Sequence, residues 1–134
     1  MEKIAVLLRM AQLFAHNAHN LISGPSFFAD HEFLGELYPV YESGYDSVVE
    51  RMIGSQMSPN LLAIQIAAIE RLKVKPADAK SPEIFKEILK IEIELRKLID
   101  MAQPGLSEGT KQMLGNLADE SEVRQYKLMQ RIKV

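Results

Sequence analysis

Three histidines and two acidic side chains supply the chemistry of this chain, and they lie close together in the sequence. His16, His19 and His31 fall within sixteen positions and are the only histidines among its 134 residues. Asp46 and Glu50 are four residues apart, so both carboxylates share one face if that segment is helical. Neutral imidazole and carboxylate together suit iron, zinc or manganese. This stretch is therefore the candidate metal site.

The composition is that of an ordinary globular chain. It is 47% hydrophobic and 25% charged, and 134 residues are enough for one domain but not for two comfortable ones. We therefore expect a single domain over residues 1–134. The formal net charge of −2 gives no excess of Lys and Arg, so the overall charge does not indicate nucleic acid or an anionic membrane as a partner.

The absence of cysteine excludes disulfides, thiolate metal sites and a cysteine nucleophile. It fits a reducing cytosol, and we expect a cytoplasmic protein. The apolar run near the N-terminus is interrupted by Arg9 and Gln12 and is too short to span a membrane. We interpret it as the first helix of the fold.

Apolar residues recur at helical spacing and predict four long helices and one short helix. The expected ranges are about 2–21, 27–55, 59–72, 83–102 and 108–132. The inner stripe of the first helix comprises Ile4, Leu7, Leu8, Ala11, Phe14, Ala15, Ala18 and Ile22. That of the fourth comprises Ile84, Ile88, Ile91, Leu95, Leu98 and Ala102. No strand pattern or repeat competes with this interpretation.

The second helix contains a proline in its middle. Pro39 removes one backbone donor and presses on the carbonyl of Gly35, so we expect a kink there, with a break of the helix as the alternative. The residues expected along its inner side are Phe28, His31, Leu34, Tyr38, Tyr41, Tyr45, Val48, Val49 and Met52.

Serine residues mark the starts of the later helices. Ser58-Pro59, Ser81-Pro82 and Ser107-Glu108 each resemble an N-cap followed by a first helical turn. Residues 73–80 are expected to form a linker. Helices joined by tight turns are normally antiparallel, whereas the long connection after the second helix can cross the length of a bundle. The predicted fold is all-α: a ferritin-like four-helix bundle with one long crossover that contains a short extra helix.

This architecture restricts which side chains can meet. On one helix His31 and Asp46 lie about 22 Å apart at ~1.5 Å per residue, so they cannot bind one ion within a chain. His19 lies before a short loop and His31 after it, so these two can converge. Two copies related by a two-fold axis would bring the imidazole pair of one chain to the acid pair of the other.

The run HNLISGPSFFADHE at positions 19–32, followed by Asp46-x-x-x-Glu50, resembles the signature of the Dps family, or mini-ferritins. The similarity extends over the whole chain, including the short middle helix and the last helix, GTKQMLGNLADESEVRQYKL. This resemblance implies a shell of twelve four-helix subunits that oxidises ferrous iron, usually with peroxide, and stores the ferric product. His19 and His31 would come from one subunit and Asp46 and Glu50 from its two-fold partner.

The chain departs from the family motif at two positions. Gly35 stands where the family has an aspartate ligand, and Asn20 where it usually has tryptophan. Glu32, Glu36 or His16 are alternative ligands. The competing hypothesis is a non-catalytic shell or scaffold that kept the fold and lost the ferroxidase site.

Simpler interpretations exist for most of these residues. Single histidines at the edge of a core are commonly structural, and Asp46 and Glu50 alone would be a solvated face or an ion pair with Arg51. The three tyrosines of the second helix are expected in the core and at interfaces. The acidic residues Asp119, Glu120 and Glu122 would line the inside of a shell or form a plain surface.

Two other functions are disfavoured. The Glu-x-x-His motif of intrachain di-iron bundles does not occur, because the residues three before the histidines are Leu13, His16 and Phe28. DNA binding in the Dps family commonly uses a lysine-rich tail, whereas this chain offers a modest basic end of Lys127, Arg131 and Lys133. We expect weak or no DNA binding, with nucleoid compaction as a third hypothesis.

Overall fold

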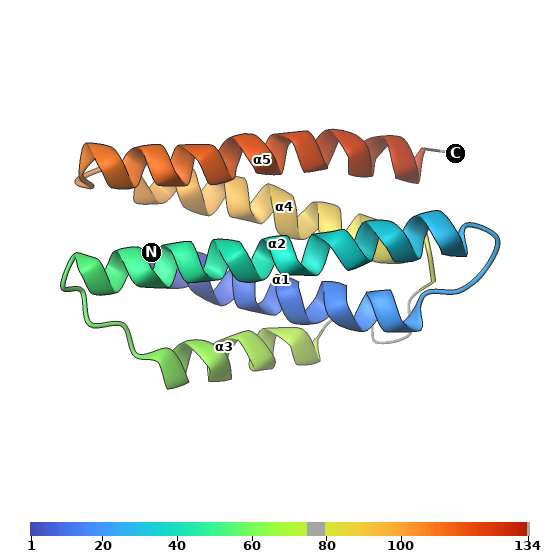
Figure 1. Ribbon diagram of the computed structural model, residues 1–134, viewed down its shortest axis with the longest axis horizontal. Coiled ribbons are helices and arrows are strands. Elements are labelled where there is room, and N and C mark those ends of the chain that lie inside the picture. Colours follow the sequence, from blue (N-terminus) through green and yellow to red (C-terminus); the bar gives the residue numbers. More distant parts are fainter. Residues whose placement is uncertain (75–79, 134) are drawn as a thin grey trace.

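The computed structural model describes residues 1–74 and 80–133, and over these residues it is helical without strands (Figure 1). The helices are α1 (Glu2–Leu21), α2 (Phe27–Gly54), α3 (Leu61–Lys73), α4 (Glu83–Ala102) and α5 (Glu108–Ile132). α1 packs antiparallel to α2, and α4 packs antiparallel to α5. α3 lies in the connection between α2 and α4 and packs on α1. This arrangement confirms the predicted four-helix bundle with one long crossover and a short extra helix.

The core follows the apolar stripes of the sequence. Every residue predicted for the inner stripe of α1 is buried. In α4 the stripe is correct from Ile84 to Leu95, but in the last turn Ile99 is fully buried, whereas Leu98 and Ala102 are half-buried. Each long helix therefore buries one face, as amphipathic helices in a bundle must.

α2 is continuous through Pro39, so the alternative of a broken helix is wrong. Pro39 itself is exposed, which places its ring on the solvent side of the helix. The prediction that Phe28 lies inside is also wrong, because it is 85% exposed. The residue four positions before buried Leu34 is Asp30, and the residue three positions before that is Phe27. Phe28 therefore falls on another face of the helix.

The helix starts are partly as predicted. The Ser107 hydroxyl accepts a hydrogen bond from the Thr110 N–H and caps α5. α3 is capped by Asn60, not by Ser58, because the Asn60 side chain accepts from the Ala63 N–H at 2.9 Å. Ser58 has a positive φ of 48° and lies before Pro59, which disfavours a helical conformation at the preceding residue.

Ser81 also has another role than the predicted cap. Its hydroxyl donates to the carboxylate of Asp30 at 2.9 Å, and the N-cap position of α4 is Pro82, which makes no side-chain cap. The linker predicted over 73–80 begins where α3 ends, but residues 75–79 lie outside the described residues. Within the described part of the chain, no helix is long and apolar enough to cross a membrane.

Candidate metal-binding half-sites

His19 and His31 face each other beside the tight turn between α1 and α2. His19 lies in the last turn of α1 and His31 in the second turn of α2. Gly24 has a φ of +104° in the turn between them, a conformation that glycine adopts without strain. The turn thereby sets the two helices antiparallel and brings the two imidazoles together, which agrees with the sequence-based expectation that they converge.

Each ring is held by the backbone of the other residue. His19 Nδ1 donates to the His31 carbonyl oxygen at 2.9 Å, and His31 Nδ1 donates to the His19 carbonyl oxygen at 2.9 Å. A carbonyl only accepts, so both Nδ1 atoms carry hydrogen, and in the neutral rings both Nε2 atoms carry a lone pair. This is the state of a histidine that binds a metal ion through Nε2 while a backbone carbonyl orients its ring.

The rings also stack. The centroids of His19 and His31 are 3.8 Å apart with planes 19° apart, and Phe27 stacks on the far side of His31 at 4.8 Å. The two Nε2 lone pairs therefore lie in nearly parallel planes. A single ion held by both rings would require one ring to turn.

His16 and the neighbouring acids do not join this pair. The exposed ring of His16 stacks on Tyr38 at 4.0 Å, and its centroid is 6.4 Å from that of His19. Glu32 is exposed, and Glu36 lines a groove between α2 and α5 on another side of the helix. Gly35 of α2 also lies against the His19 ring, one turn after His31. None of the three alternative ligands therefore occupies the position that Gly35 leaves without a carboxylate.

Asp46 and Glu50 are exposed toward the other end of α2. Arg51, their expected ion-pair partner, instead donates from Nη1 to the Thr110 hydroxyl at 3.2 Å. In residues 1–74 and 80–133 no group of three or more His, Asp or Glu side chains could hold a metal ion. One chain therefore presents an imidazole pair and an acid pair in separate places.

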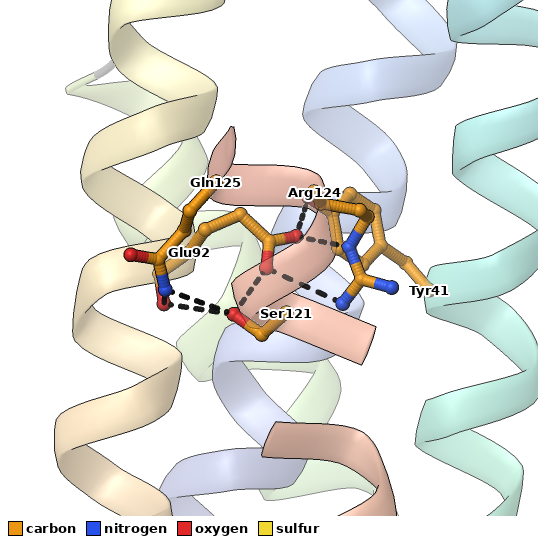
Figure 2. Close-up of polar contacts among 5 residues, drawn as sticks. All are labelled: Tyr41, Glu92, Ser121, Arg124 and Gln125. Carbon is orange, nitrogen blue, oxygen red and sulfur yellow. Dashed lines mark hydrogen bonds and ion pairs between the residues drawn. The ribbon is translucent and has the colours of Figure 1, made fainter. Parts of the chain in front are cut away.

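A second polar cluster, which the sequence analysis missed, lies in the middle of the bundle (Figure 2). Glu92 of α4 is 0% exposed and accepts from the Tyr41 hydroxyl at 2.5 Å, the Ser121 hydroxyl at 2.6 Å and Arg124 Nε at 2.7 Å. Gln125 completes the group, which we call the Glu92 cluster, by donating to the Glu92 carbonyl at 3.4 Å. The sequence did carry a signal, because Glu92 lies four residues after Ile88 and three before Leu95, on the buried face.

Burial and neighbouring charges shift the pKa values of two groups in this cluster. Burial, reinforced by the Glu92 carboxylate, raises the pKa of Tyr41 well above its ordinary value. Burial alone would lower the pKa of Arg124, but its hydrogen bonds and ion pair with Glu92 outweigh this and raise it. The cluster is therefore an internally satisfied buried network of the kind that fixes how helices pack.

A smaller buried network joins α2, α4 and α5 near the start of α2. Asp30 of α2 is 3% exposed and accepts from Arg131 of α5 at 2.8 Å and 3.0 Å, and from the Ser81 hydroxyl. Burial alone would raise the pKa of Asp30, but the hydrogen bonds from Arg131 and Ser81 hold it below its ordinary value. The start of α2, the start of α4 and the end of α5 are thus tied together.

The acidic residues of α5 divide between two surroundings. Asp119 and Glu120 line the groove between α2 and α5, a cavity of about 400 Å³ that Arg124 and Lys127 also border. Glu122 forms an ion pair with Arg96 at 3.7 Å. They are therefore not one continuous acidic patch.

The tyrosines of α2 largely match their expected packing role. Tyr41 and Tyr45 are buried, and the Tyr45 hydroxyl accepts from Gln65 of α3 at 2.8 Å. Tyr38 is half-buried and lies beside the histidines, with its ring 5.6 Å from that of His19.

Comparison with known proteins agrees with this architecture. Residues 2–133 match the family described as Ferritin-like domain. The chain belongs to the ferritin-like family. DNA protection during starvation protein 2 of Bacillus anthracis is 28% identical over 111 residues, which cover 80% of this chain and 76% of the relative. DNA protection during starvation protein of Brevibacillus brevis is 29% identical over 105 residues, covering 74% and 69%. Together these similarities identify a Dps-type ferritin-like protein.

Proposed function

We propose that this Dps-type protein assembles into a hollow shell, binds ferrous iron between two-fold-related subunits, oxidises it and stores the ferric product. The observation that carries the proposal is the state of the imidazole pair: both Nδ1 atoms donate to backbone carbonyls, so both Nε2 atoms are available to metal. Iron is the substrate and cargo of this reaction. The role in protection against oxidative damage follows from removing ferrous iron and its oxidant together.

The second half of the site comes from another copy of the chain. Asp46 and Glu50 are exposed and lie about 22 Å and about 28 Å along α2 from His31, at ~1.5 Å per residue. An isologous pair places the acid pair of each subunit opposite the imidazole pair of the other, giving two equivalent sites. A dodecamer built from such dimers is the proposed assembly.

The donor types support oxidation. Imidazole nitrogen from His19 and His31 suits ferrous iron, whereas the anionic oxygens of Asp46 and Glu50 stabilise the harder ferric ion and so favour loss of an electron. Peroxide or dioxygen is the proposed electron acceptor. In this scheme one ring turns out of the stack so that both histidines hold the ion, and the carboxylates neutralise its charge.

Anaerobic titration of the purified protein with ferrous iron, followed by peroxide or air, tests the proposal. We expect saturable binding and oxidation faster than in protein-free buffer, with both lost in His31→Ala. His16→Ala is the matched control, because His16 makes no contact with either Nδ1–carbonyl bond, and it should retain both activities. Equal rates for wild type, His31→Ala and buffer would refute the ferroxidase proposal.

The second candidate is a shell or scaffold without iron chemistry, favoured by the absence of a carboxylate at Gly35. The two candidates separate in the same experiment when the assembly is weighed by light scattering. A multi-subunit shell that oxidises iron no faster than buffer supports the scaffold, whereas a monomer contradicts both.

DNA binding is proposed to be weak or absent, although both relatives are named for DNA protection. Arg131, one of the three basic residues near the C-terminal end, is engaged by Asp30 and is less free to meet phosphate. A gel shift at low and moderate salt tests this, and strong retardation that weakens steeply with salt would contradict it.

A further inference from the structure

Gly35 lies against the imidazole of His19 across the interface of α1 and α2. A Cβ atom placed on Gly35 would be 2.9 Å from His19 Cε1 and 3.2 Å from His19 Nδ1. Carbon atoms in favourable contact are about 3.5–4.0 Å apart, so a side chain at this position would displace the ring. The imidazole therefore occupies space that exists because residue 35 has no side chain.

The crowded nitrogen is the one that fixes the tautomer. His19 Nδ1 donates to the His31 carbonyl, and Gly35 lies one turn after His31 on the same face of α2. A Cβ at position 35 would crowd both this nitrogen and the neighbouring Cε1, so the ring could not keep its present place beside the carbonyl. The absence of a side chain thus leaves the ring the position from which Nδ1 reaches its acceptor.

Backbone conformation gives no other reason for glycine here. Gly35 lies inside α2 and, unlike Gly24 and Gly105, does not have a positive φ. Glycine inside a helix costs about 1 kcal/mol relative to alanine. What sets Gly35 apart from Gly44, the other glycine in the interior of α2, is the close approach of the His19 ring.

We propose that Gly35 is a positioning residue for metal binding. By leaving room for the His19 ring beside the His31 carbonyl, it holds His19 in the Nδ1–H tautomer and keeps the Nε2 lone pair available to a divalent ion. The half-site of this chain then consists of ordered imidazole nitrogen, and its carboxylates come from elsewhere. The part that concerns metal rests on the proposed function, whereas the part that concerns the tautomer stands without metal.

Two matched variants test the proposal, Gly35→Ala and Gly44→Ala. Both place alanine inside α2, so both should fold and gain helix propensity. They differ in space, since a Cβ at Gly44 meets Leu8 Cδ2 at 3.5 Å and Leu117 Cδ2 at 3.7 Å, which are ordinary contacts. Thermal unfolding confirms that both variants are folded before the site is measured.

The first readout is the histidine tautomer in metal-free protein labelled with ¹⁵N, observed by long-range proton–nitrogen correlation. The spectra are recorded at a mildly alkaline pH. In wild type and Gly44→Ala we expect His19 and His31 with hydrogen on Nδ1. In Gly35→Ala we expect His19 to lose this preference, and an unchanged His19 spectrum would overturn the proposal.

The second readout is binding of Co²⁺, followed by its visible absorbance. Removing a group that orients a metal-binding histidine typically weakens affinity roughly 10–100-fold, and we expect a loss of that size in Gly35→Ala but not in Gly44→Ala. Equal affinity in the two variants, or no binding by wild type, would overturn the proposal.

The experiments distinguish a failure of the proposed iron oxidation from a failure of the positioning role. If wild type does not oxidise iron but the tautomer and Co²⁺ affinity respond to Gly35→Ala as expected, oxidation is refuted and the positioning role stands. If wild type oxidises iron but Gly35→Ala leaves the tautomer unchanged, the positioning role is refuted.

Discussion

The imidazole pair and the Glu92 cluster are both polar groups between packed helices, but they differ in whether their polar atoms all have hydrogen-bond partners within the protein. In the Glu92 cluster the buried carboxylate receives hydroxyl and guanidinium donors from α2 and α5 (Figure 2). In the imidazole pair, Nδ1 of each ring donates a hydrogen bond to a backbone carbonyl, and Nε2 keeps its lone pair. In the Glu92 cluster the polar groups stabilise the packing of the helices. In the imidazole pair the packed helices orient the rings and leave one nitrogen of each able to bind a ligand.

This difference gives a criterion for telling a structural polar group from a functional one. A buried charge must be paired, because leaving it unpaired costs several kcal/mol. A partly exposed imidazole can keep a free lone pair, because water satisfies it until a ligand replaces the water. Mutations in the Glu92 cluster should therefore change stability, and mutations in the imidazole pair should change metal binding.

The largest expected effect on stability is that of Arg124→Met. It leaves the Glu92 carboxylate in the core without its ion-pair partner, at a cost of roughly 3–5 kcal/mol of unfolding free energy. Urea unfolding at fixed protein concentration measures this loss. The control is the double variant Glu92→Met, Arg124→Met, which removes both charges and should recover part of the loss, since the Tyr41 hydroxyl still loses its acceptor. Equal losses in the single and double variants would contradict the assignment of the cost to an unpaired carboxylate.

An intermediate effect is expected for Tyr41→Phe, which removes the hydroxyl that donates to Glu92 at 2.5 Å. A hydrogen bond to a charged group contributes roughly 1.5–3 kcal/mol, and this variant should lose that amount at neutral pH.

The loss in Tyr41→Phe should depend on pH in a defined direction. The raised pKa of Tyr41 means that the folded protein keeps the phenol proton while the unfolded chain releases it near the ordinary value of 10. The stabilisation from this hydroxyl is present below pH 10 and falls above it. The difference in unfolding free energy between wild type and Tyr41→Phe should therefore narrow as the pH rises past 10. A gap that widens there would contradict the role of the hydroxyl.

The smallest expected effect on stability is that of His31→Ala. It removes one hydrogen bond to the His19 carbonyl and the ring's two stacks, on His19 and on Phe27, worth about 1–2 kcal/mol together. The same variant is expected to lose iron binding. Urea unfolding and iron titration on one preparation test both statements, and a loss of stability as large as that of Arg124→Met would remove the contrast between the two regions.

Much of the architecture could be predicted from the sequence, because it depends on local and periodic signals. The apolar stripe of α1, the short loop that follows it and the cap at Ser107 each concern residues within a few positions of one another. The errors occurred where the signal was ambiguous by one or two residues. Phe28 lies one residue after Phe27, which packs against the core, and Ser58 lies two residues before Asn60, which caps α3.

The candidate site was predicted in part. The closeness of His19 and His31 follows from a short loop between two helices, so sequence separation alone indicated it. The separation of the acid pair from the imidazole pair follows from helix rise along α2. Whether the two halves meet in a dimer is not a property of one chain, and it stays a prediction.

The helices, their order and the two sets of candidate metal ligands could thus be predicted from the sequence, since they depend on residue type and on periods of three to four residues. The tertiary structure alone decided the atomic states. It assigned the Nδ1 hydrogens through carbonyls twelve residues away, and it joined Glu92 to Arg124 across two helices. It also placed Gly35 under the ring of His19. Contacts between residues far apart in the chain carry no local pattern, and they form only when the packed faces of the helices meet.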